Sequence, residues 1–334
     1  MSNQEYKLSD GSGFDSLKLH KSSTIPQPNP GEVRIKFHAC SLNYRDLLIT
    51  KGLYPLSLKA NVIPLSDGAG KIVAVGEGVT HLKIGDRAFA STLGGGHDGC
   101  LRQYGTFRAL SCVKIPSTLS YEEAATLPCA ALTAWNALYG ISDKALKPGQ
   151  TVLVQGTGGV SLFGAQFALA AGAKVILTSS SNKKIATIKK HFEEKNIMTI
   201  NYSEFPEWST KAKELTNGRG VDHILEVGGQ NTLKQSIEAL ALGGSIHVIG
   251  FLGHGNGPEM SASELARNTL YKNACIRGVL IGSVEQFKAM NSAIEANNIK
   301  PIIDKVFQFE DVKSAYEYQW SQQHIGKVVI QIPQ

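Results

Sequence analysis

Residues 151–161, TVLVQGTGGVS, constrain the fold of this chain more than any other segment. An apolar run typical of a strand leads into a glycine turn, and the turn leads into a segment that favours a helix. Gly156 permits a tight turn, and Gly158 lets the backbone approach a ligand closely because it has no Cβ. The N-terminus of the following helix offers free N–H groups and a partial positive charge to phosphate groups. The segment therefore predicts a strand–turn–helix unit that can hold the pyrophosphate of a dinucleotide.

One departure and one alternative go with this turn. The third position of the motif is Ser161, where Gly or Ala usually allows the helix to pack closely on the strand. A glycine-rich turn between strand and helix can also exist without any ligand. The residues predicted to lie at the phosphates are Gly156, Gly158, Gly159 and Val160.

Strand and helix patterns alternate from residue 151 onward. Such alternation predicts a doubly wound parallel sheet, and so an α/β fold for this part of the chain. The expected strands are 151–155, 174–178, 197–200, 222–227 and 245–250, and the expected helices are 162–171, 183–192, 205–215 and 233–240.

The part of the chain before residue 121 is rich in short strand patterns, which indicate a small β-barrel or sandwich. Residues 305–309 and 327–332 return to a strand pattern and flank a helix over 311–320, so the C-terminus could complete this first domain. The expected N-terminal elements are strands over 31–37 and 70–75, a hairpin over 82–90, and two short helices within 121–138 that meet at Pro128, with Ser120 as N-cap.

Length and composition agree with two ordinary globular domains. The chain has 334 residues, and a domain typically has about 150. We expect a β-rich domain over 1–122, completed by 300–334, and a dinucleotide-binding domain over 123–299. The net charge is +6, without a basic stripe that carries interleaved aromatics, so nucleic acid is not an expected partner. Five widely spaced cysteines, a polar N-terminal segment and the lack of a membrane-length apolar run favour a cytoplasmic protein.

The loop after the second expected strand bears on the choice of cofactor. A free ribose 2′-hydroxyl is usually bound by Asp or Glu about 20 residues beyond the glycine turn. Residues 177–184 read LTSSSNKK and contain no carboxylate. Hydroxyls and an ammonium suit a 2′-phosphate, so the loop favours NADPH over NADH. The loop can also be a plain connection with Ser181 as a helix N-cap, and both can hold at once.

These residues, in this order, resemble the medium-chain dehydrogenase/reductase superfamily, in its zinc-free branch near the quinone oxidoreductases. The resemblance implies a GroES-like β-rich catalytic domain, a Rossmann domain with the cofactor in the cleft between them, and homodimers or tetramers. Its motifs are ACSLNYRD at 39–46, PLSDGAG at 64–70, VGEGV at 75–79, LPCAALTAW at 127–135, GVD at 220–222 and EVGG at 226–229.

The resemblance also allows a local argument about metal. At the positions of the catalytic zinc ligands in zinc alcohol dehydrogenases, this chain has Asn43 and Ser66, with Asp67 in place of the adjacent Glu. Only Cys129 keeps a ligand type, whereas a catalytic zinc needs about three protein ligands. The cysteine pairs of the structural zinc lobe are missing as well. We therefore expect no metal.

Without a metal, hydrogen-bond donors must polarise the oxygen of the acceptor. The resemblance implies that Asn43 lies by the nicotinamide and its ribose and that Thr133 faces the cofactor. Tyr44 and Arg45 could donate to a substrate, although packing and surface pairing are equally open roles. Asp46 is expected to anchor the motif through hydrogen bonds. No residue is identified as an obligatory proton donor, so solvent can serve.

Further positions follow from the resemblance alone. It implies Ser180 and Lys184 at the 2′-phosphate, Tyr202 over the adenosine, Gly228 and Phe251 along the cleft, and Gly282 and Lys327 at the nicotinamide end and the phosphates. An apolar strand over Cys275–Ile281 would be the edge of a homodimer.

The leading hypothesis is an NADPH-dependent oxidoreductase that reduces a small electron acceptor, either a quinone or an α,β-unsaturated carbonyl compound. Reduction of aldehydes or ketones and a non-catalytic dinucleotide-binding role are the alternatives. The substrate, the strictness of the preference for NADPH, and dimer versus tetramer stay open.

Overall fold

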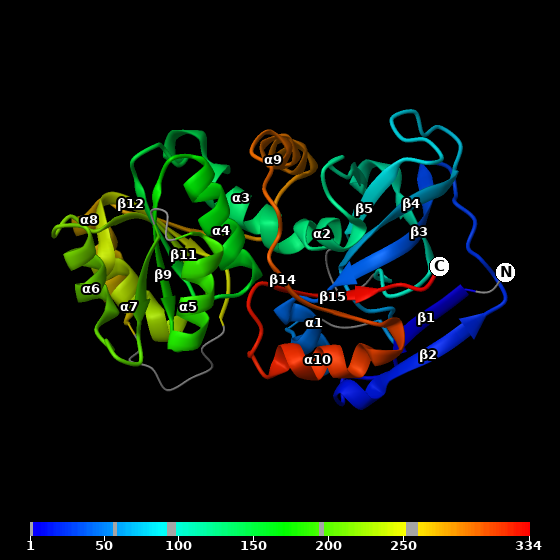
Figure 1. Cartoon of the computed structure of the whole chain (residues 1–334), viewed down its shortest axis with the longest axis horizontal. Helices are drawn as coiled ribbons and strands as arrows, with labels where there is room; N and C mark the ends of the chain where they lie inside the picture. The colour runs from blue at the N-terminus through cyan, green and yellow to red at the C-terminus, as the bar shows by residue number, and fades with distance from the viewer. Residues whose placement is uncertain (1–2, 56–58, 92–97, 194–196, 252–259) are drawn as a thin grey trace. The chain divides into compact units, whose positions relative to one another are not determined.

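The structure is a computed structural model that describes residues 3–55, 59–91, 98–193, 197–251 and 260–334. The chain forms two compact units, drawn in Figure 1. The first consists of Met1–Leu132 together with Ser283–Gln334, and the second is Thr133–Gly282.

The second unit is built on a parallel sheet whose order is β10-β9-β8-β11-β12-β13. From β8 the chain first adds β9 and β10 on one side and then adds β11, β12 and β13 on the other. The direction of strand order therefore reverses between β8 and β11, as in doubly wound dinucleotide-binding sheets. Strands β8, β9 and β11 are almost wholly buried, as expected for a sheet that helices cover on both faces. The strands are β8 (Thr151–Gln155), β9 (Lys174–Ser179), β10 (Ile197–Asn201), β11 (Val221–Glu226), β12 (Leu240–Val248) and β13 (Cys275–Gly278). The helices are α3 (Leu132–Tyr139), α4 (Gly159–Ala170), α5 (Asn182–His191), α6 (Trp208–Leu215), α7 (Gln230–Ala239) and α8 (Ala262–Lys272).

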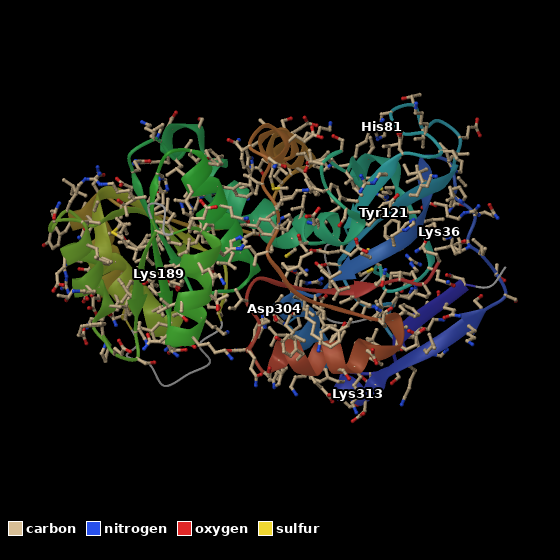
Figure 2. All side chains as sticks on the ribbon, in the orientation of Figure 1. Lys36, His81, Tyr121, Lys189, Asp304 and Lys313 are labelled. Carbon is tan, nitrogen blue, oxygen red and sulfur yellow. The ribbon has the colours of Figure 1, made fainter. Side chains whose placement is uncertain are left out.

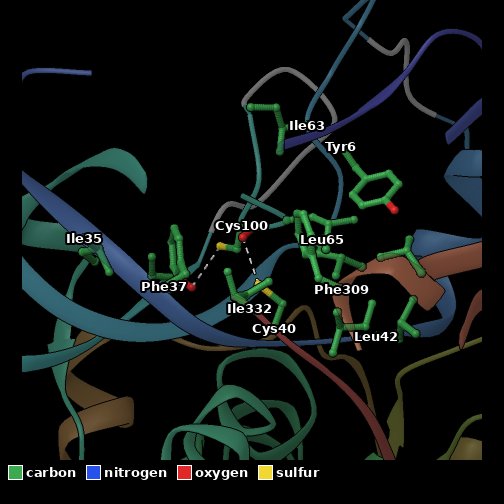
Figure 3. Packing of buried hydrophobic residues seen from close by; sticks show 14 of the residues in the cluster. Tyr6, Ile35, Phe37, Cys40, Leu42, Ile63, Leu65, Cys100, Phe309 and Ile332 are labelled. Carbon is green, nitrogen blue, oxygen red and sulfur yellow. Dashed lines mark hydrogen bonds between the residues drawn. The ribbon is translucent and has the colours of Figure 1, made fainter. Parts of the chain in front are cut away.

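The first unit is a β-rich domain whose main sheet has the order β14-β15-β3-β4-β5-β7, with β6 also paired to β3. Its core includes Phe37, Leu65 and Phe309, and Figure 3 shows residues from both ends of the chain packed together there. The strands are β1 (Asn3–Leu8), β2 (Leu17–Ser22), β3 (Glu32–Ser41), β4 (Asp67–Val75), β5 (Arg87–Ser91), β6 (Tyr104–Arg108), β7 (Val113–Lys114), β14 (Ile303–Phe307) and β15 (Lys327–Gln331). The helices are α1 (Tyr44–Thr50), α2 (Tyr121–Ala125), α9 (Val284–Ala296) and α10 (Val312–Trp320).

The C-terminal strand belongs to this first unit. Strand β15 pairs antiparallel with β3, with Val329 opposite Ser41, and parallel with β14. The fold class expected from the sequence, a GroES-like β-rich domain plus a Rossmann parallel-sheet domain, is confirmed.

The unit boundaries lie at 132/133 and 282/283, whereas the sequence pattern placed them at 122/123 and 299/300. Helix α9 belongs to the first unit because Phe287 stacks on Phe89 with ring centroids 4.8 Å apart. The side chain of Asn291 also donates to the carbonyl of Lys114 at 3.0 Å. Leu127–Ala131 is a π-helical turn, and its Cys129 N–H donates to the first unit.

Some expected elements differ from the structure. The hairpin expected over 82–90 is wrong, because only β5 is a strand there and Gly85, with φ +94°, turns the chain before it. The capping box is confirmed: Glu123 N–H donates to Ser120 Oγ at 3.1 Å, and Ser120 N–H donates to the Glu123 carboxylate at 2.8 Å. No helix in the described ranges is both long and apolar enough to span a bilayer.

Candidate functional site

The glycine turn after β8 has the geometry that the sequence predicted. Gly156 has φ +75°, which favours glycine, and Gly158 is the N-cap of α4. A Cβ built on Gly158 would meet no protein atom within 4 Å, so this backbone faces open space. Helix α4 begins at Gly159 and directs its free N–H groups toward the turn. The turn therefore fits the pyrophosphate of a dinucleotide.

The side chain of Ser161 is buried and hydrogen-bonded behind this turn. Its hydroxyl donates to the carbonyl of Gln155 at 2.6 Å, and the residue is only 2 % exposed. The extra oxygen at the third motif position is thus used inside the fold and does not obstruct the packing of helix on strand.

A buried carboxylate, Glu226, holds the neighbouring turn in place. It lies at the end of β11 and accepts from the side-chain amide of Gln155 at 2.7 Å. It also accepts from the backbone N–H groups of Gly228 at 3.0 Å and Gly229 at 2.9 Å, and from the hydroxyls of Thr232 and Ser236. The order of strands reverses between β8 and β11, which is where such sheets usually bind their ligand. The hydrogen bonds to Glu226 therefore hold Gly228 at this position. The sequence analysis did not predict this hydrogen-bond network, although a glutamate that ends an apolar strand just before Gly-Gly could have indicated it.

The residues expected at the adenosine end lie in the loop after β9, in the first turn of α5 and directly after β10. Ser180 is exposed, and Ser181 caps α5 by accepting from the Lys184 N–H at 3.3 Å, as the sequence predicted. Tyr202 follows β10, and its N–H donates to the carbonyl of Ser179 at 3.0 Å. One unpredicted carboxylate, Glu204, lies here too, and it accepts from Asn182 and from Asn201.

The other predicted positions of the second unit are more scattered. Thr133 is buried at the start of α3, and Phe251, which follows β12, is 68 % exposed. Gly282 follows Ile281, which has φ +55°, a strained conformation for a β-branched residue. The carbonyl of Ile281 accepts from the Asn136 side chain at 2.7 Å, and this hydrogen bond helps to hold the turn.

A second cluster of polar residues lies inside the first unit. It contains Asn43 at the N-cap of α1, Ser66 and Asp67 where β4 begins, Cys129 in the π-turn, and Lys327 at the start of β15. All but the partly exposed Cys129 are buried, Lys327 to 3 % exposure. We call these five residues the Asn43–Lys327 cluster. The backbone that enters it is strained, because Leu65 has φ +67°.

Hydrogen bonds connect the members of this cluster in one series. The Lys327 ammonium donates to Asn43 Oδ1 at 2.7 Å and to the carbonyl of Leu42 at 2.6 Å. Asn43 Nδ2 lies 3.4 Å from Ser66 Oγ, and that hydroxyl donates to Asp67 Oδ1 at 2.8 Å. The other oxygen of Asp67 accepts from the Cys129 N–H at 3.0 Å. Sequence analysis placed Lys327 at the cofactor but did not predict its bond to Asn43.

Burial sets the electrostatics of the cluster. It lowers the pKa of Lys327, against the opposing effect of Asp67 and the other acidic groups nearby. It raises the pKa of Asp46 to about 6, against Arg45, and Asp46 anchors the motif by accepting from the Asn43 N–H at 2.8 Å. The pKa of the Cys129 thiol rises to about 12, first through burial and then through Asp67, so this thiol is protonated at neutral pH.

Tyr44, the neighbour of Asn43, lies in an aromatic cluster. Its ring is parallel to that of Trp320 at 6.3 Å, and burial raises its pKa. Arg45 lies over the ring of Tyr54 at 5.3 Å, with its guanidinium 3.8 Å from the Asp46 carboxylate. The contact of Trp320 with Tyr44 was not predicted, because the sequence around Trp320 in α10 does not indicate which residue it packs against.

The cluster does not fit a catalytic zinc. Both Asp67 oxygens already accept hydrogen bonds, and the side-chain oxygen of Asn43 faces an ammonium, whose charge would repel a metal cation. Among the described residues, no three His, Cys, Asp or Glu side chains are grouped as metal ligands. A closed or open zinc site needs about three such ligands.

Two family models match the chain. Residues 29–117 match the alcohol dehydrogenase GroES-like domain, and residues 159–296 match the zinc-binding dehydrogenase domain. A zinc-type alcohol dehydrogenase-like protein of Schizosaccharomyces pombe is 49% identical and covers 96% of each chain. The quinone oxidoreductase of Homo sapiens is 31% identical and covers 91% of this chain and 90% of its own.

Solved structures agree with these relatives. A Sinorhizobium meliloti protein provisionally described as an alcohol dehydrogenase has a TM-score of 0.88 at 34% identity, covering 99% of both chains. An NAD-dependent alcohol dehydrogenase has a TM-score of 0.87 at 26% identity, covering 99% of this chain and 100% of its own.

The GroES-like unit, the parallel sheet and the glycine turn together define an oxidoreductase that binds a nicotinamide dinucleotide. The chain belongs to the medium-chain dehydrogenase/reductase superfamily.

Proposed function

We propose that this chain is a zinc-independent, NADPH-dependent reductase that transfers a hydride to a quinone or an α,β-unsaturated carbonyl compound. The observation that carries the proposal is the Lys327 ammonium bonded to Asn43, at the position of a zinc ligand in zinc alcohol dehydrogenases. Because the Lys327 ammonium bonds to Asn43 there, we expect a hydrogen-bond donor of the protein, in place of a metal ion, to polarise the oxygen of the acceptor. The free thiols of all five cysteines support a reducing, cytoplasmic setting.

The protein's own part in the reaction falls to the amide of Asn43. The bound dinucleotide supplies the hydride. The Asn43 side chain offers an N–H to the acceptor oxygen, where negative charge develops as the hydride arrives. A quinone or an enone spreads that charge over a conjugated system, whereas an aldehyde concentrates it on a single oxygen. One neutral donor therefore suits the conjugated acceptors better, and solvent supplies the final proton.

The preference for NADPH rests on the loop after β9. Ser180 and Lys184 offer a hydroxyl and an ammonium, and the carboxylate of Glu204 is engaged by Asn182 and Asn201. A charge-assisted hydrogen bond to a phosphate contributes roughly 1.5–3 kcal/mol. We expect Lys184→Ala to raise the Kd for NADPH about 10- to 100-fold and to change that for NADH little.

The matched control is Lys183→Ala, which removes an exposed lysine from the same helix turn. It should leave both dissociation constants unchanged. Equal losses for NADPH and NADH in Lys184→Ala would contradict the assignment of the 2′-phosphate to this loop.

The test of the proposed function is consumption of NADPH by chelator-treated protein with quinones, enones, aldehydes and ketones, followed by the nicotinamide absorbance. Turnover with quinones or enones alone is the expected result. Protein purified without added metal should contain no stoichiometric zinc. About one zinc per chain, or activity that chelation abolishes, would overturn the proposal.

Reduction of aldehydes or ketones is the second candidate, which the name of the fission yeast relative favours. Turnover with those acceptors in the same assay would establish it. A non-catalytic binding role would instead give tight NADPH binding without turnover, with salt-sensitive RNA binding. Two lysines of the first unit, Lys36 and Lys313, lie apart in Figure 2, and Lys313 pairs with Asp15 at 2.5 Å.

A further inference from the structure

Chemistry fixes the orientation of the Asn43 side chain. The ammonium of Lys327 has only donors, so the amide atom 2.7 Å from it must be the oxygen. At the other end of the series, Asp67 accepts at both oxygens, so the Ser66 hydroxyl donates toward it and turns its lone pairs to Asn43. A donor-only group and an acceptor therefore set the polarity of every hydrogen bond between them.

This polarity leaves donor capacity on Asn43. Its NH₂ group carries two N–H bonds, and the contact to Ser66 Oγ is long, at 3.4 Å. The described residues provide no other acceptor for the amide nitrogen of Asn43. Bonding of its oxygen to a cation also polarises the amide and makes these N–H groups stronger donors.

We propose that Lys327 is a positioning residue that locks Asn43 with its amide N–H groups toward the acceptor oxygen. This inference rests on the proposed function. The resemblance to known dehydrogenases placed Lys327, with Gly282, directly at the cofactor, at its nicotinamide end and phosphates. In the structure, two of its three N–H bonds go to Asn43 and Leu42 inside the first unit. Lys327 thus acts on the reaction through Asn43.

A double-mutant cycle separates the two roles. Lys327→Met keeps the length of the side chain and removes its charge, and it should lower kcat about 10- to 100-fold with KM for NADPH nearly unchanged. Asn43→Ala should lower kcat by at least as much. If Lys327 acts through Asn43, the double variant should be no slower than Asn43→Ala. Losses that multiply, or a KM for NADPH that rises in place of the fall in kcat, would overturn the proposal.

A second variant leaves Lys327 intact, in case Lys327→Met does not fold. Asn43→Asp offers the ammonium a carboxylate of the same shape but has no N–H to donate. It should fold with an unchanged Tm and be as slow as Asn43→Ala. An Asn43→Asp enzyme with wild-type kcat would show that the donor is not used.

A readout independent of turnover separates failure of this inference from failure of the proposed function. The side-chain amide resonances of Asn43, assigned by their loss in Asn43→Asp, should be sharp in the wild type and shifted or broadened in Lys327→Met. Unchanged resonances would refute the anchoring even if the enzyme is active. Shifted resonances in a protein without any turnover would keep the anchoring and reject the proposed function.

Discussion

At the scale of single residues, two glycines in the phosphate turn differ in why they must be glycine. Gly156 has φ +75°, so a side chain there strains the folded backbone. Gly158 has φ −79°, which any residue adopts, and open space next to it. The first glycine serves the fold and the second serves the ligand.

We therefore expect Gly158→Ala to fold with unchanged Tm and to raise the Kd for NADPH at least about tenfold, because its methyl group takes the place of the pyrophosphate. Gly156→Ala should lower the free energy of unfolding by about 1–2 kcal/mol. Calorimetry and fluorescence titration of both variants check this. Wild-type affinity in Gly158→Ala would show that the pyrophosphate lies elsewhere.

Sequence reasoning reached the local features of these sites but not their long-range partners. The glycine turn and the Ser181 cap follow from neighbours in the chain, and the structure has both. The bond from Lys327 to Asn43 joins residues 284 positions apart, and no periodicity or motif spacing contains that information. The same holds for the link between Gln155 and Glu226.

At the scale of elements, two adjacent parallel strands carry a buried histidine pair. Strand β11 holds His223 and β12 holds His247, with His223 Nδ1 3.2 Å from His247 Nε2 and the rings nearly parallel. Burial lowers the pKa of His223 to about 4, and burial together with His223 lowers the pKa of His247 well below its usual value. Both side chains are therefore neutral in the folded protein at neutral pH.

This pair predicts loss of stability in acid. The unfolded chain takes up a proton at His223 near pH 6.5, whereas the folded chain does so only near pH 4, so the free energy of unfolding falls as the pH drops between these values. The shift corresponds to roughly 3 kcal/mol for this residue. In denaturant unfolding measured at a series of pH values, the free energy of unfolding of His223→Gln should fall less steeply toward low pH than that of the wild type. His20→Gln, at an exposed site on β2, is the control, and an equal slope in all three proteins would refute the role of the pair.

Elements with a strong local period were predictable, and those that rely on distant partners were not. The β8–α4–β9–α5 series is confirmed because each element carries its own apolar pattern. Helices α1, α8 and α9 escaped prediction. Helix α9 is placed by contacts such as that between Phe287 and Phe89, which lie far apart in the sequence.

At the scale of the whole molecule, strand β13 forms one edge of the sheet in the second unit. Strand β13 lies last in its sheet and pairs only with β12 among the described strands. It runs over Cys275–Gly278, shorter than the 275–281 that the sequence suggested. Exposed apolar side chains belong to the same unit: Leu242, Leu270, Tyr271 and Leu280 are 72–81% exposed. An edge strand without an outer partner among the described residues, in a unit that also exposes apolar side chains, favours pairing with a second copy.

We expect a homodimer of the 35.9 kDa chain, formed through β13. Leu280→Lys should shift the mass measured by light scattering toward that of a monomer, because it places a charge in the interface. Ile84→Lys changes an exposed apolar residue of the first unit and should leave the dimer intact. A wild-type monomer, or a Leu280→Lys dimer as stable as wild type, would contradict this interface.

The discontinuity of the first unit has a consequence for synthesis on the ribosome. Asn43 emerges early, but Lys327, its anchor, is translated only after the whole second unit. Strand β3 likewise waits for β15 before its sheet is complete. The second unit is continuous in the chain and can fold as a unit while translation proceeds. The dinucleotide-binding unit can thus form before the unit that holds Asn43 and Lys327 is complete. Ribosome-bound chains that stop short of residue 327 should therefore bind cofactor but show no oxidoreductase activity.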